Sequence, residues 1–104
     1  MDLLEIVLDS WDRNNTILVN LLRAMPEGGL DAQVMEGSPT VARMFMHMHY
    51  CRLVFINEDI PEFATELPAE WRSERDPACI EQMLNDSAKH VRTAIQSSSS
   101  PGAG

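Results

Sequence analysis

The chain has 104 residues, of which 44% are hydrophobic and 23% charged, a composition typical of one globular domain rather than of a disordered segment. Sixteen acidic residues oppose eight lysines and arginines, so the formal net charge is −8, and the basic residues form no cluster. Because contact with phosphate needs a cationic surface, this balance excludes nucleic acids and anionic membranes as partners.

Residues 2–25 have the pattern of an amphipathic helix. Their apolar side chains recur at alternating steps of three and four residues, which keeps them on one side of a helix. The predicted inner face consists of Leu4, Val7, Trp11, Asn14, Leu18, Leu21 and Met25. Pro26 and the Gly28-Gly29 pair end this helix, because proline resists a helix interior and glycine supplies the conformations of a turn.

A second helix is predicted over residues 39–56. Ser38 offers a capping side chain, and Pro39 suits the first helical position, where its missing amide hydrogen costs nothing. The predicted inner face consists of Val41, Met44, Met48, Cys51 and Phe55. On this face Cys51 is interpreted as a small buried apolar residue rather than a nucleophile. Met44 and Met48 are interpreted as core residues rather than copper ligands.

Residues 57–75 show no sustained periodicity and contain two prolines, so they are predicted to form a long connection. Fully extended, this segment reaches about 60 Å, which exceeds the length of about 25 Å of the preceding helix. The helices on either side can therefore run parallel, as in bundles with a long crossover. Phe63 and Trp71 are expected to attach the connection to the core.

A third helix is predicted over residues 77–96, where Asp76 and Pro77 repeat the start signal of a cap followed by proline. Its inner face consists of Ile80, Leu84, Ser87, Val91 and Ala94 or Ile95. Residues 97–104 are rich in serine and glycine and are predicted to be a flexible tail. Because no window alternates with period two, the predicted fold is an all-α helical bundle in one domain, residues 1–96.

The compartment follows from what the sequence lacks. No segment has the features of a signal peptide, and none contains the roughly 20 consecutive apolar residues that span a bilayer. The two cysteines, Cys51 and Cys79, form no CxxC motif and are expected to remain thiols in a reducing compartment. A cytoplasmic protein is therefore expected.

Two histidines, His47 and His49, interrupt the apolar run "MFMHMHYC" of the second helix. At about 100° of rotation per residue, His47 lies roughly 80° from the centre of the predicted inner face and His49 roughly 120° away on the other side. The pair therefore cannot bind one metal ion, which on a helix needs ligands at i, i+3 or i, i+4. His49 is predicted to face solvent and His90 to lie at the boundary of the third helix. His47 is either a metal ligand in the bundle or a packing residue at the core edge.

Asn14 is the single polar residue in the predicted inner face of the first helix. A buried amide must find hydrogen-bond partners, and in coiled coils such a residue often fixes the register or the number of helices. It is equally suited to line a small polar cavity opposite His47. The sequence leaves these two roles open.

The stretch "SPTVARMFMHMHYCRLVFI", preceded by "SWDRNNTILVNLLRAMP", resembles the DinB-like family. Members of that family have a second helix of the type Ser-Val-Ala-x-x-Leu-x-His followed by a hydrophobic residue, and a first helix with Trp, a nearby Asn and a Leu-Leu pair. The resemblance implies a four-helix bundle with a long crossover between helices 2 and 3. It also implies a divalent-metal site with one histidine on helix 2 and two on helix 4, spaced HxxxH, and by position His47 matches the helix 2 ligand.

The resemblance further implies a relation to metal-dependent thiol S-transferases and isomerases, which use low-molecular-weight thiols such as bacillithiol or mycothiol. No HxxxH occurs in the 104 residues, which end after the third predicted helix. The expected metal site, for zinc or nickel, therefore has His47 as its one ligand from this chain, and no catalytic residue is assigned.

Two functions follow as alternatives. The first is an incomplete DinB-like protein that binds a divalent metal and is related to the S-transferases. The second is a metal-free helical interaction module in which His47 packs at the core edge. In both, three helices shaped for a four-helix core leave an apolar groove open, so a homodimer is expected to cover it.

Overall fold

The structure, a computed structural model, describes residues 2–33, 35–67 and 74–98. Its elements are α1 (Leu3–Arg23), the short 3-10 helix η1 (Gly29–Asp31), α2 (Val41–Asp59), a second 3-10 helix η2 (Pro61–Phe63) and α3 (Pro77–Ser98). Within these ranges the extended pairing is limited to one isolated bridge between Gln33 and Thr40. The all-α fold predicted from the sequence is confirmed.

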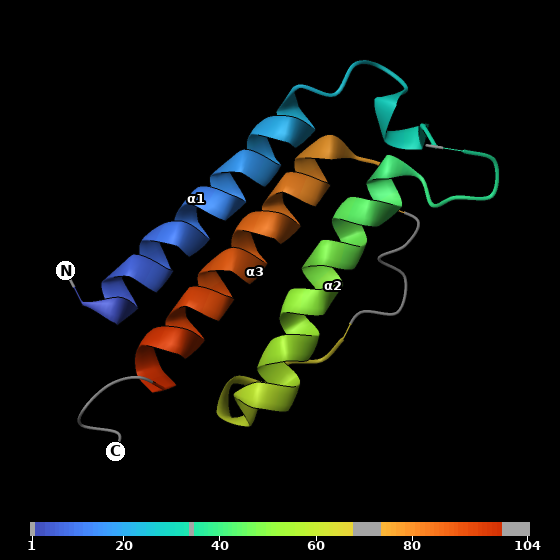
Figure 1. Cartoon of the computed structure of the whole chain (residues 1–104). Coiled ribbons are helices and arrows are strands. Elements are labelled where there is room, and N and C mark those ends of the chain that lie inside the picture. The colour runs from blue at the N-terminus through green and yellow to red at the C-terminus, as the bar shows by residue number, and fades with distance from the viewer. Residues whose placement is uncertain (1, 34, 68–73, 99–104) are drawn as a thin grey trace.

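The three long helices lie side by side with α3 in the middle (Figure 1). The main helix-to-helix contacts are those of α3 with α1 and of α3 with α2. Helix α1 runs opposite to the other two, whereas α2 and α3 run in the same direction (Figure 1). The connection after α2 therefore returns along the bundle, as its length and lack of periodicity predict.

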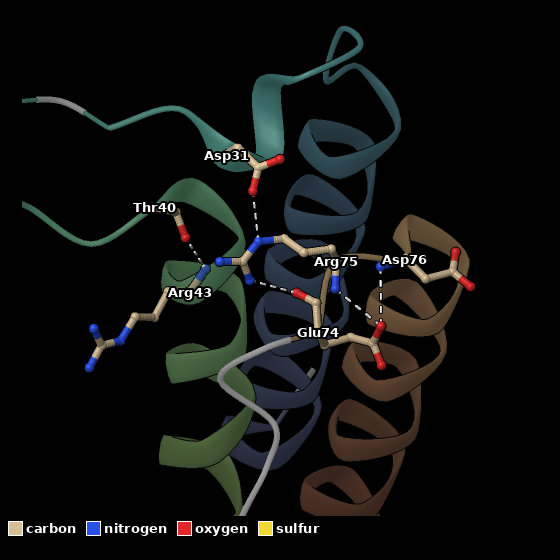
Figure 2. Close-up of polar contacts among 6 residues, drawn as sticks. All are labelled: Asp31, Thr40, Arg43, Glu74, Arg75 and Asp76. Atoms are coloured by element: carbon tan, nitrogen blue, oxygen red, sulfur yellow. Dashed lines mark hydrogen bonds and ion pairs between the residues drawn. The ribbon is translucent and has the colours of Figure 1, made fainter.

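Side-chain caps fix where the helices begin. The Asp2 Oδ1 accepts a hydrogen bond of 2.8 Å from the Glu5 amide at the start of α1. At α2 the cap is Thr40, whose Oγ1 accepts from the Arg43 amide at 3.2 Å (Figure 2). The prediction of a Ser38 cap is therefore wrong by two residues, because the Ser38 hydroxyl instead donates to the Met35 carbonyl in the preceding turn at 2.8 Å.

The start of α3 follows the predicted pattern. The Asp76 Oδ1 accepts from the Ala78 amide at 3.1 Å, and Pro77 is the first residue of the helix. At the other end α3 continues to Ser98, so Ser97 and Ser98 belong to the helix rather than to the predicted tail. Residues 99–104 of that tail lie outside the described residues.

The end of the crossover is tied to η1 (Figure 2). Arg75 Nε donates a hydrogen bond of 2.8 Å to Asp31 Oδ1, which joins the end of the crossover to the connection between α1 and α2. The Glu74 carboxylate accepts from the backbone amides of Arg75 and Asp76, each at 3.1 Å. These contacts set the position at which α3 begins.

The beginning of the crossover is attached to α3, as predicted for Phe63. The His90 Nε2 donates to the Phe63 carbonyl at 2.8 Å, and the two rings meet edge to face with centroids 6.4 Å apart. His90 is half-buried, as its predicted boundary position requires. Trp71, the other residue predicted to anchor this segment, lies outside the described residues.

The core lies between α3 and its two neighbours. Its fully or nearly buried apolar residues include Leu22, Leu30, Ala42, Phe45, Met46, Ile80 and Leu84. The predicted inner face of the third helix is confirmed, since Ile80, Leu84, Ser87, Val91 and Ala94 are all buried.

The inner face predicted for α1 is wrong at every second position. Leu8, Val19 and Leu22 are buried, whereas Val7 and Leu21 are 41% and 50% exposed. Asn14, predicted to lie in that face, is exposed, so neither of its proposed buried roles applies. Its neighbour Asn15 is half-buried instead, and the Asn15 Nδ2 donates to Asn85 Oδ1 on α3 at 2.9 Å.

The inner face predicted for α2 is wrong at most of its positions, although Val41 packs against the core cluster. Phe45, Met46, Leu53 and Ile56 form the buried side, together with Ala42. Met48 and Phe55, predicted to be buried, are 39% and 40% exposed, and Cys51 is also exposed. Helix α2 has two apolar stripes roughly 120° apart, and α3 packs against the one that the periodicity did not favour. The other stripe, Met44, Met48, Cys51 and Phe55, is called the open stripe below.

Candidate functional site

The shift of the buried face on α2 exchanges the predicted places of two histidines. His47 is exposed, next to the open stripe, whereas His49 is only 7% exposed and points toward α3. The predictions of a solvent-facing His49 and an inward His47 are therefore both wrong. The physical reason is that α3 selects the stripe containing Phe45, Met46 and Leu53, and His49 shares that side of the helix.

His47 lies close to a second side chain that can bind a metal, the thiol of Cys51. Its Nε2 is 3.4 Å from the Sγ of Cys51, one helical turn further along α2. Both side chains are exposed, so the pair is open to solvent and to ligands. The i, i+4 spacing of an imidazole and a thiol is readable in the sequence, but the interpretation of Cys51 as a core residue hid it. We call these two residues the His47–Cys51 pair.

The other thiol has a different environment. Cys79 Sγ donates a hydrogen bond of 2.9 Å to Glu74 Oε1. This bond to a carboxylate, with some burial, raises the pKa of Cys79, and the same bond lowers the pKa of Glu74. Since the thiolate is the nucleophile and the metal ligand, the raised pKa makes Cys79 a poor nucleophile and a poor metal ligand.

Arg52 is a buried cation that was not predicted as a functional residue from the sequence. Its side chain is 7% exposed, and its Nη1 donates to the Leu84 carbonyl at 2.8 Å and to Ser87 Oγ at 3.1 Å. The guanidinium lies over the Trp11 ring, 4.8 Å from its centroid, which is a cation–π geometry. Burial lowers the pKa of Arg52. Arg52 lies three residues after His49, on the same buried side of α2. Recognising the second apolar stripe of this helix in the sequence would have identified both residues.

Arg52, Ser87 and Trp11 form a cluster, to which α1 contributes Trp11. Its indole Nε1 donates to the Ala88 carbonyl of α3 at 2.9 Å. A buried arginine is normally satisfied by a carboxylate, yet no ion pair of Arg52 occurs within the described ranges. Its Nη2 is buried without a hydrogen-bond partner there. Among the described residues, no carboxylate therefore balances the buried charge of Arg52.

A shallow groove of about 330 Å³ opens beside this cluster, and its surface is almost wholly apolar. Residues of all three long helices line it, namely Trp11, Cys51, Arg52, Phe55, Val91 and Ile95. Cys51 belongs both to this groove and to the His47–Cys51 pair. The groove therefore lies directly beside the candidate metal ligands.

The His47–Cys51 pair supplies part of the ligand set that a divalent metal ion needs. An imidazole nitrogen and a thiol sulfur are typical ligands of zinc and of similar soft metals. A group of three or more histidine, cysteine, aspartate or glutamate side chains able to hold a metal is absent from residues 2–33, 35–67 and 74–98. One copy of the described residues thus supplies two donors, while a zinc site in a protein uses three or four.

His49 predicts a pH dependence of stability. Burial, reinforced by the nearby Arg52 charge, lowers the pKa of His49 below its ordinary value. The unfolded chain then binds a proton that the folded chain does not, so stability is complete above about pH 6.5 and falls as the pH drops below it. The loss approaches about 1.4 kcal/mol per pH unit between the two pKa values.

Urea denaturation of the chain between pH 7.5 and pH 5.5 measures this slope. His49→Leu should flatten it, because the variant has no imidazole at this buried position. An unchanged slope in His49→Leu would show that His49 is not the titrating group.

None of the helices within the described residues is long and apolar enough to cross a membrane. A comparison with family models matches residues 2–100 of the chain to the DinB family. No curated protein and no solved structure matches the chain. The matched range covers all three long helices, the His47–Cys51 pair and the groove.

Proposed function

The chain belongs to the DinB family, and we propose that it binds a divalent metal ion, zinc or nickel, with His47 as a ligand. The observation that supports this proposal is the exposed position of His47 next to the open stripe of α2, with its Nε2 3.4 Å from the Cys51 sulfur. A cytoplasmic location is part of the proposal, since both cysteines are free thiols, the state that a reducing compartment maintains.

The chemistry proposed for this site is that of a thiol S-transferase or isomerase. A bound divalent metal would supply Lewis-acid activation of a low-molecular-weight thiol. The residues of the chain would bind and orient the reactants: the His47 ring offers a nitrogen to the metal, and the apolar groove beside Cys51 takes an apolar group of the second substrate. Trp11 and Phe55 would exclude water from that group.

His47→Ala tests the metal proposal. We expect the purified protein to contain zinc or nickel and the variant to lose it, because the substitution removes a ligand. The His47 side chain is exposed, so its removal should leave the fold intact. Elemental analysis after dialysis against the metal gives the readout. His90→Gln is the matched control, since it also removes one imidazole but should retain the metal. Metal content unchanged in His47→Ala would contradict the proposal.

A second candidate function is a metal-free helical interaction module that forms a homodimer through the exposed apolar surface. On α1, Leu3, Ile17 and Leu21 are each at least half exposed, at 76%, 58% and 50%. Apolar surfaces of this kind are commonly covered by a partner. Sedimentation of chelator-treated protein separates the two candidates: a metal-free dimer favours the module, and a well-folded monomer at micromolar concentration counts against it.

A further inference from the structure

The His47–Cys51 pair already has the spacing of two ligands on one metal. In a tetrahedral zinc site, a Zn–N bond of about 2.05 Å and a Zn–S bond of about 2.3 Å place nitrogen and sulfur about 3.6 Å apart. The observed distance between His47 Nε2 and Cys51 Sγ is 3.4 Å. The two donors on α2 are therefore separated by nearly the distance that two ligands of one zinc ion require.

Two donors leave a tetrahedral ion half coordinated. The described residues offer no third histidine, cysteine or carboxylate that gathers with this pair. A second copy of the chain, related by a two-fold axis through the metal, supplies the same two donors again. The result is a Cys₂His₂ set, a common composition of closed structural zinc sites.

We infer that two copies of this chain share one zinc ion, bound by His47 and Cys51 of each copy, with their open stripes in contact. This inference rests on the proposed function. It specifies which residues bind the metal and that the partner is a second copy of the chain. Each Cys51 thiol loses its proton to solvent when the Zn–S bond forms, so two protons are released per zinc bound.

The surface around the pair suits a second copy. The pair lies near the middle of α2, which spans Val41–Asp59, so a two-fold axis there sets the full lengths of two open stripes against each other. Met48 and Phe55 flank the pair and are 39% and 40% exposed. Burial of these side chains on both copies would remove apolar surface from water and exclude water from the metal.

The charges of α2 favour an antiparallel arrangement of the two copies. Exposed Arg43 lies in the first turn of the helix, and exposed Glu58 and Asp59 lie in the last turn. Within one helix these charges oppose the macrodipole, because cations are favoured at the C-terminus and anions at the N-terminus. Two antiparallel helices bring the basic end of each close to the acidic end of the other, which reverses this unfavourable arrangement.

Titration of the metal-free full chain with Co²⁺ and Zn²⁺ tests the inference. We expect half a metal ion per chain, a thiolate-to-cobalt charge-transfer band with the strong visible bands of a tetrahedral site, and a zinc-dependent change from monomer to dimer in sedimentation. A chelator should reverse the dimerisation. Cys51→Ser should abolish the charge-transfer band and the zinc-dependent dimer, whereas Cys79→Ser, the matched control, should retain both.

The possible failures are distinguishable. One metal ion per chain, lost in His47→Ala but kept in Cys51→Ser without a charge-transfer band, would overturn the shared site and leave the proposed function standing. No metal binding at all, or binding that survives in His47→Ala, would overturn both. A dimer of equal strength with and without metal would also overturn the shared site. Circular dichroism of each variant confirms that it remains folded.

Discussion

Met46→Ala is expected to lower the free energy of unfolding by about 2–5 kcal/mol. The Met46 side chain is 0% exposed and belongs to the core cluster with Leu22, Phe45 and Leu84. Its truncation removes packed atoms and leaves a cavity that the surrounding helices fill only in part. For a domain whose total stability is about 5–15 kcal/mol, this loss is among the largest that one substitution can cause.

Met48→Ala is the matched control, with the same chemical change two residues further along α2. Its side chain is 39% exposed on the open stripe, so we expect a change within about 0.5 kcal/mol. Urea denaturation of chelator-treated, monomeric protein gives both values. Met46→Leu should lose less than about 1.5 kcal/mol, because it conserves volume. Equal losses in Met46→Ala and Met48→Ala, or a larger loss in Met48→Ala, would show that the buried side of α2 is misassigned.

Arg52→Ala is expected to destabilise the chain by about 2–4 kcal/mol, mainly through the packing of the buried side chain. The substitution removes the two hydrogen bonds to Leu84 and Ser87 and the cation–π contact with Trp11. It leaves a cavity at the point where all three long helices approach the groove. Urea denaturation measures the loss, and the change in Trp11 fluorescence reports whether its environment opens to water.

Arg52→Met separates packing from charge. Methionine fills much of the same volume without a buried charge, and replacing a buried ion by an apolar residue is often neutral or stabilising. Ser87 stays satisfied, because its hydroxyl donates to the Leu84 carbonyl at 3.2 Å. We expect Arg52→Met to be within about 1 kcal/mol of the parent chain or more stable. A loss as large as that of Arg52→Ala would show that the charge itself holds the helices together.

The helical elements and their order were predictable from local chemistry. The capping Asp76 followed by Pro77, the glycine and proline residues after α1, and the steps of three and four in the apolar pattern all act within a few residues of the chain. The parallel course of α2 and α3 was also predictable, since the segment between them is long enough to return along the bundle (Figure 1). None of these features depends on which helix packs where.

The buried faces were predictable only for α3, which has one apolar stripe. On α1 and α2 the periodicity fits two stripes, since steps of three and four can be drawn through Leu21 or Leu22 and through Met48 or Met46. The contact with α3 decides between them, and it buries Leu22 and Met46. A rotation of roughly 120° about the axis of α2 separates the two solutions, and that rotation reverses the environments of His47 and His49.

The sequence by itself determined that this chain forms three helices with a long crossover, and that it resembles the DinB family. The tertiary structure alone decided that His49 and Arg52 are buried and that His47 and Cys51 lie together on the exposed side of α2. The physical reason is that hydrogen bonds within a helix and its caps are local, whereas the choice of buried stripe depends on the free energy of packing against α3, a helix distant in sequence.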